Sequence, residues 1–239
     1  TIGTISTDSD AAVIVTTAAD TTITAAAALS VRATSSGQAT VIANLAKTVT
    51  VTATEEAIIT ANVADTVTFV TGDGIDTLSV STIDSTITST NANTMTVNVA
   101  GNAAATSVDI SGAPNVNRVN VTGTPNVTLK VSLVAIDGLG TATTGTTADD
   151  NVLTVVKGNA GTTDIFIKTT GGDADFSAAI VSSIIVGAAL AAADDLTVAS
   201  DALIVSAVDQ TSDIDIIAKN STATNNNVFI AVKDNAAAG

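Results

Sequence analysis

The sequence predicts an all-β protein built as a β-solenoid-like stack of short strands, with tandem β-sandwich domains as the alternative. Apolar and polar residues alternate with a period of two along most of the chain, which is typical of strands with one buried and one exposed face. These runs begin about every nine to eleven residues and are separated by Gly, Asn, Asp and Pro. The chain has no Trp or Tyr, residues that immunoglobulin-like sandwiches usually place in their cores, whereas a narrow stacked core of Val, Ile, Leu and Ala needs neither.

The strand pattern is clearest in residues 1–136, which we expect to form a Thr-rich β-repeat lobe. In residues 47–54, apolar Val and Ala alternate with Thr, so that the two kinds of side chain lie on opposite faces. Thr-x-Thr pairs begin at Thr48, Thr66 and Thr86, and this regularity is what stacked rungs require. The same alternation predicts strands at 66–70, 77–81, 86–90, 94–99, 107–110, 118–122 and 127–131.

The rest of the chain is expected to form a linker and a second β lobe. Residues 137–150 are rich in Gly and Thr, have no strand pattern and read as a linker. Residues 151–239 form the second lobe, in which a short Ala-rich helix is expected near residues 187–195. The strands predicted in this lobe are 164–167, 180–186, 202–205 and 213–217.

Composition excludes several kinds of chemistry and of partner. The 239 residues include no Cys and no His, so that thiol catalysis, imidazole catalysis, zinc fingers and disulfides are excluded. The formal charge is −15 and the few Lys and Arg are scattered, so we expect no nucleic-acid partner. The longest apolar stretch, residues 178–193, is shorter than the roughly 20 residues that cross a bilayer, so no membrane span is expected.

The acidic residues point to turns and to calcium. There are 21 Asp against two Glu, and Asp favours turns and calcium loops. In the segment 72–78, the glycines allow a tight turn and the aspartates supply hard oxygen ligands. A partial copy of this pattern occurs in residues 171–176. An ordinary Gly-Asp turn that enters a strand is the alternative to a calcium site. The candidate calcium ligands are Gly72, Asp73, Gly74, Asp76, Asp173 and Asp175.

The motif at 72–78 resembles the glycine-rich nonapeptide of RTX proteins, with Thr71 in place of the first Gly and without tandem copies. Two Gly-x-Pro-Asn-Val repeats, at 112–116 and 123–127, and a composition rich in Thr, Ala, Val and Asn make the chain similar to bacterial surface-layer (S-layer) proteins. That resemblance implies a repetitive extracellular β-protein of the cell surface, which assembles into a lattice with calcium at subunit contacts. Large adhesins share these features.

No enzyme is predicted. Carboxylate pairs occur at 149–150, at 194–195 and at Asp213 and Asp215, but sugar-cleaving sites generally add aromatic platforms, and capping of turns explains the pairs. No phosphate-binding loop and no aspartic-protease signature occurs. Candidate N-glycosylation sites are the sequons at Asn120, Asn126 and Asn220.

We therefore expect an extracellular structural protein that self-assembles into a cell-surface layer or filament, by strand addition and with calcium. The chain begins at Thr1 without an initiator Met or signal peptide, as in a processed form, an excised domain or the ordered part of a longer protein. Its partner would be a second copy of itself, and a cell-surface glycan is a further candidate. The alternatives are an adhesin-type binding module and an ice-binding protein with Thr-x-Thr ladders. The candidate assembly strands contain Val13, Val15, Val228, Phe229 and Ile230.

Overall fold

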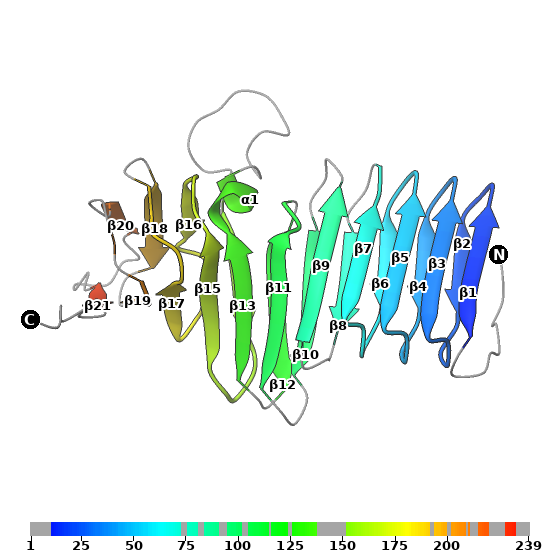
Figure 1. Ribbon diagram of the computed structural model, residues 1–239, viewed down its shortest axis with the longest axis horizontal. Coiled ribbons are helices and arrows are strands. Elements are labelled where there is room, and N and C mark those ends of the chain that lie inside the picture. Colours follow the sequence, from blue (N-terminus) through cyan, green and yellow to red (C-terminus); the bar gives the residue numbers. More distant parts are fainter. Residues whose placement is uncertain are drawn as a thin grey trace, which may run out of the picture.

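The chain winds into a β-solenoid, which confirms the predicted fold class (Figure 1). All the pairings between neighbouring strands of the described residues are parallel, as expected when each strand stacks on its counterpart one coil earlier. The computed structural model describes residues 11–72, 76–80, 84–90, 95–101, 105–114, 116–123, 126–137, 152–191, 194–199, 202–208, 210, 215–219 and 228–232.

Within this part of the chain, the strands form three parallel sheets, and in most coils one strand lies on each side of the core. The 11-stranded sheet has the order β1 (Ala12–Thr17), β3 (Ser30–Ser35), β5 (Thr48–Ala53), β7 (Thr66–Val70), β9 (Asp84–Thr90), β11 (Thr106–Gly112), β13 (Val127–Ser132), β15 (Thr163–Thr169), β17 (Ser183–Val186), β19 (Leu203–Ser206) and β21 (Phe229–Val232). The 7-stranded sheet contains β2 (Thr21–Thr24), β4 (Ala39–Ile42), β6 (Ala57–Thr60), β8 (Asp76–Val80), β10 (Met95–Gly101), β12 (Val116–Gly123) and β14 (Thr154–Lys157). The 3-stranded sheet contains β16 (Ala174–Phe176), β18 (Asp195–Ala199) and β20 (Asp215–Lys219).

Most of the predicted strands are confirmed, because the period of two marks them directly. The strand expected at 66–70 is β7 with the same bounds, and the one expected at 127–131 is β13 with one residue more. In the first coils the repeat is regular: Ser30 pairs with Thr48, and Thr48 with Thr66. Each inward side chain therefore lies on its counterpart from the coil before.

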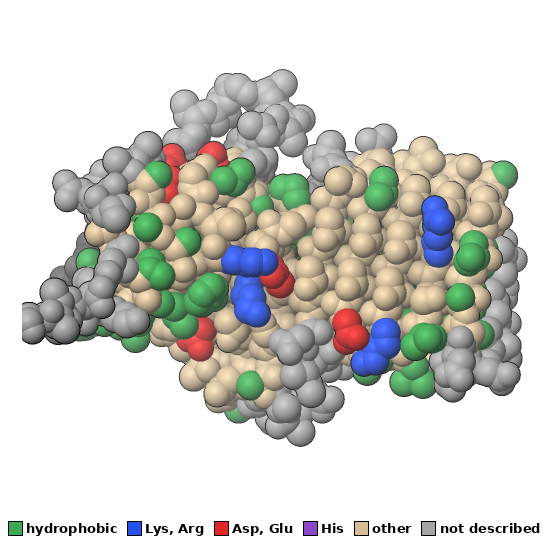
Figure 2. Space-filling view, viewed as in Figure 1, with side chains coloured by type: hydrophobic (Ala, Val, Ile, Leu, Met, Phe, Trp, Pro, Cys, Tyr) green, Lys and Arg blue, Asp and Glu red, His purple; other side chains and the backbone are tan. Residues whose placement is uncertain are grey.

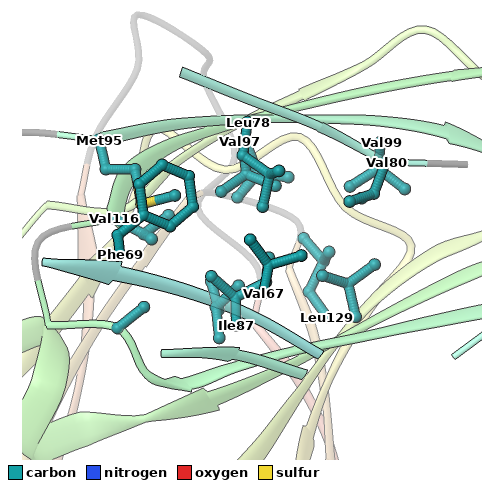
Figure 3. Packing of buried hydrophobic residues seen from close by; sticks show 14 of the residues in the cluster. Val67, Phe69, Leu78, Val80, Ile87, Met95, Val97, Val99, Val116 and Leu129 are labelled. Carbon is teal, nitrogen blue, oxygen red and sulfur yellow. The ribbon is translucent and has the colours of Figure 1, made fainter. Parts of the chain in front are cut away.

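The core is narrow and almost entirely aliphatic. Figure 3 shows Val67 and Ile87, from the 11-stranded sheet, facing Leu78 and Val97, from the 7-stranded sheet. Phe69 of β7 and Phe176 of β16 are the largest fully buried side chains. Val, Ile, Leu and Ala fill most of a core of this width, which explains how a chain without Trp or Tyr can fold.

Alanine occupies the tight corners between strands. Ala25 and Ala28 are fully buried, and the N–H of Ala28 donates to the carbonyl of Ala25 at 3.2 Å. The next two coils repeat this turn with Ala43 and Ala46 and with Ala61 and Ala64. In these three coils a methyl group fits the corner without pushing the sheets apart.

The Ala-rich helix expected near residues 187–195 is not formed by the described residues of that segment. They make another corner, in which the N–H of Asp194 donates to the carbonyl of Ala191 at 3.0 Å and Leu190 is buried. The prediction was wrong because Ala here fits a corner and not a helix. The helix that the structure has, α1 (Leu133–Asp137), lies elsewhere, and it buries Leu133 and Ile136.

The strand ladders are continuous across the predicted linker. β13 pairs with β15, and β12 with β14, although the partners are 36 residues apart in the sequence, as in Val127 with Thr163 and Arg118 with Thr154. Of the segment 137–150, only Asp137, the last residue of α1, is described.

The described helix is much too short to cross a membrane.

Candidate functional site

The first candidate site is the turn between β7 and β8, which contains the motif at 72–78. Gly72 and Asp76 are described, whereas Asp73 and Gly74 lie outside the described residues. A Cβ on Gly72 would lie 1.9 Å from the carbonyl oxygen of Thr54 in the coil before, so only glycine fits there. The motif thus has a structural reason for its glycine that does not involve a metal.

Asp76 is fully buried and bonds to the preceding coil. Its Oδ1 accepts a hydrogen bond from the N–H of Ala57 at 2.8 Å, and its Oδ2 accepts one from the hydroxyl of Thr71 at 2.6 Å. Burial raises the pKa of Asp76, and the hydrogen bonds from Thr71 and Ala57 offset this only in part. The carboxylate therefore has a definite structural partner on each oxygen, and calcium at this turn stays a prediction.

The second set of predicted ligands lies among turns of the C-terminal coils. Asp173 Oδ1 accepts from the N–H of Asp195 at 2.8 Å, and Asp175 Oδ1 from the N–H of Ser177 at 2.7 Å. The buried Asp194, which the sequence did not single out as a ligand, accepts from the N–H of Ala191 at 2.8 Å. Among the described residues, no three acidic side chains converge as a metal cluster.

The outward face of the 7-stranded sheet carries a hydrogen-bonded amide ladder. The amide of Asn120 donates to Asn98 Oδ1 at 2.8 Å, and the amide of Asn98 donates to the hydroxyl of Ser79 at 3.4 Å. Arg118 Nε donates to Asn120 Oδ1 at 3.0 Å. These polar groups are largely satisfied by one another.

The sequon residues differ in their surroundings. The amide nitrogen of Asn120, the atom that would carry a glycan, is engaged in the ladder. Asn126 is exposed and its Oδ1 accepts from the N–H of Thr162 at 3.0 Å, which leaves its amide nitrogen out of that bond. Asn220 lies outside the described residues.

Over its N-terminal half, the outward face of the 11-stranded sheet carries threonines in place of the amide ladder seen on the 7-stranded sheet. The outward side chains of β5, β7 and residues 85–90 of β9 are threonines, with Val70 as the one other residue in those stretches. They stand in register, since Thr48 pairs with Thr66 and Thr66 with Thr86. Figure 2 shows that charged side chains are sparse on this side of the molecule. We call these residues the threonine face: Thr48, Thr50, Thr52, Thr66, Thr68, Thr86, Thr88 and Thr90.

The two ends of the 11-stranded sheet are edge strands, β1 and β21, within the described part of the chain. Val13 and Val15 of β1 point inward and are buried. At the other end, Ile230 continues the row of Ile184 and Ile204, yet Ile204 is 2% exposed and Ile230 is 53% exposed. Val228 is partly buried against the core and Phe229 is exposed.

Comparison with protein-family models, with curated proteins and with solved structures finds no match for this chain.

Proposed function

We propose that this protein is an extracellular structural module that self-assembles end to end, with β21 of one copy stacked on β1 of the next. The observation that carries the proposal is the inward row at the last described strand, where Ile230 is 53% exposed while its neighbour Ile204 is buried. An inward-facing apolar side chain without a covering coil is a natural seat for another coil. In a second copy, the first described strand, β1, carries Val13 and Val15 on its inward side, where both are already buried.

The geometry of such a contact follows from the internal pairings. Because the strands pair in parallel within the molecule, the same translation would place β1 of the next copy beside β21. This interface joins two different surfaces, so it leaves each added copy with a free end and grows as an open filament. The negative charge of every module opposes the association, and cations relieve that repulsion.

We also propose that calcium binds at the turn of residues 72–76. Asp73 is the other acidic residue of this motif in the sequence, whereas Asp76 bonds to Thr71 and Ala57. We expect calcium to raise the melting temperature of the wild-type protein and not that of Asp73→Asn, because a ligand that binds only the folded state stabilises it. An equal response of both proteins, or none in either, contradicts calcium binding at this turn.

Self-assembly is tested by sedimentation velocity of Ile230→Lys beside Leu45→Lys. A charge on the inward row should dissociate polymers into single modules, because an unpaired ammonium cannot be buried in the contact. Leu45 is also exposed and apolar but lies in a corner between β4 and β5, so its variant should assemble like wild type. A wild-type protein that stays monomeric contradicts the proposal and favours the adhesin-type binding module.

A further inference from the structure

We propose that the threonine face binds ice, as a surface that orders the first layer of lattice water. This function is separate from end-to-end assembly, because the face lies on the side of the solenoid and the contact proposed above lies at its ends. Three properties of the face support it: the regular spacing of its side chains, the unused hydroxyl groups and the absence of charge.

The spacing is fixed by the parallel ladder. Thr50 pairs with Thr68 and Thr68 with Thr88, so that hydroxyls and methyls repeat across the strands about every 4.7–4.9 Å and along each strand about every 6.6 Å. The repeat across the strands is close to the shorter spacing between oxygen atoms on the prism faces of hexagonal ice. Thr is β-branched and stiff at χ1, which keeps the array ordered before it meets the ligand.

The coil between β7 and β9 is longer than the one before it, but the threonines stay in register across it. Thr48 and Thr66 are 18 residues apart, whereas Thr66 and Thr86 are 20 apart, yet both pairs are in direct register. The additional residues are taken up outside the paired strands. The face is therefore continuous over β5, β7 and β9.

Most hydroxyls of the face make no hydrogen bond within the described part of the chain. Apart from Thr90, whose Oγ1 lies 3.5 Å from the carbonyl oxygen of Phe69, none of them hydrogen-bonds to another group of the described residues. On the opposite sheet, by contrast, Asn120, Asn98 and Ser79 bond to one another. Free hydroxyls interspersed with methyl groups can anchor lattice waters without competing partners.

The charge of the face matches an uncharged ligand. In a protein with a formal charge of −15, the described outward side chains of β5, β7 and β9 carry no charge. Charged side chains border the face on both sides: Arg32 of β3 pairs with Thr50, and Asp109 of β11, which bonds to Lys168, pairs with Thr86. A crystalline polysaccharide is the other neutral, periodic ligand, but the aromatic ring of this region, Phe69, is buried and offers no stacking platform.

The test is thermal hysteresis and incorporation into a growing ice hemisphere, measured on the full chain. Wild type should show hysteresis and enter the ice, and Thr68→Lys, at the centre of the face, should lose most of both. Thr60→Lys is the matched control, because Thr60 is a half-buried outward threonine of β6 on the opposite sheet and its variant should keep wild-type activity. Circular dichroism verifies that both variants fold.

Three results overturn the proposal: wild type without hysteresis, equal losses in both variants, or binding to cellulose or chitin particles that Thr68→Lys abolishes while ice binding is absent. Ile230→Lys separates this function from assembly. It should retain the hysteresis of a single module whether or not wild type polymerises.

Discussion

Asp76 replaces a backbone carbonyl for Ala57. In the two preceding coils the equivalent N–H groups, those of Thr21 and Ala39, donate to the carbonyls of Gln38 and Glu56 at 2.9 and 3.0 Å. At Ala57 the acceptor is instead the side-chain oxygen of Asp76, at 2.8 Å. The substitution occurs where the repeat lengthens, since Ile58 pairs with Thr77. A buried carboxylate thus keeps the ladder satisfied where the repeat is irregular.

Replacing this carboxylate should destabilise the fold. Asp76→Ala leaves the buried N–H of Ala57 without this acceptor, so we expect the free energy of unfolding to fall by about 1–3 kcal/mol in urea denaturation. Asp76→Asn is the control, because its amide oxygen can still accept from Ala57, and it should be closer to wild type. Equal stability of Asp76→Ala and wild type contradicts the role of the bond.

The same residue should give the stability a pH dependence. Because burial raises the pKa of Asp76, the folded state binds this proton more tightly than the unfolded state does. The contribution of Asp76 to stability therefore rises as the pH falls through its folded pKa, and it is fully present below the unfolded pKa. Urea titrations at several pH values should show this rise in wild type relative to Asp76→Asn. A difference that does not change with pH is the contrary result.

Asp109 should give the stability a pH dependence of the opposite sign to that of Asp76. Burial alone would raise its pKa, but hydrogen bonds from Lys168 and Ser111 lower the pKa overall, and the Lys168 Nζ lies 2.7 Å from Asp109 Oδ2. The stabilisation is present above the unfolded pKa of Asp109 and is lost as the pH falls through its folded pKa. Lys168→Met should cost about 0.5–1 kcal/mol near neutral pH and little in acid. Lys47→Met, which breaks a more exposed pair, serves as the comparison.

Gly187 should be intolerant of any side chain. A Cβ at this position would lie 2.1 Å from Cζ of the Phe166 ring and 2.8 Å from the carbonyl oxygen of Ile167. We expect Gly187→Ala to lower the free energy of unfolding by about 1–3 kcal/mol. Phe166→Ala should relieve part of this cost, so a double-mutant cycle should give a favourable coupling between the two changes. If the free-energy changes of the two substitutions were strictly additive, the Phe166 ring would not be what excludes a side chain at Gly187.

Sequence reasoning could predict the strands because their signal is local. The alternation of Val and Thr in 48–53 defines the inward and outward faces of β5 without knowledge of any neighbour. The corners are harder to predict from the sequence, because Ala is compatible with both a helix and a tight turn. Only the stacking of the coils decides between the two. This is why residues 187–195 were predicted to be helical.

The candidate sites depend on which side chains become neighbours, and the sequence shows this only in part. The spacing of Thr48, Thr66 and Thr86 signalled the threonine face, whereas the bond between Asp76 and Ala57 joins two coils and has no local pattern. The inward row at Ile230 likewise follows from its place after Ile204, 26 residues earlier in the chain.

Negative-stain electron microscopy of the purified protein, in calcium and after chelation, tests the central claim most directly. End-to-end stacking predicts filaments one solenoid wide in wild type and in Leu45→Lys, and single particles in Ile230→Lys. If chelation dissolves the filaments, calcium takes part in the contact between copies. If the filaments persist, strand stacking alone holds the copies together. Single particles of wild type under both conditions would contradict self-assembly.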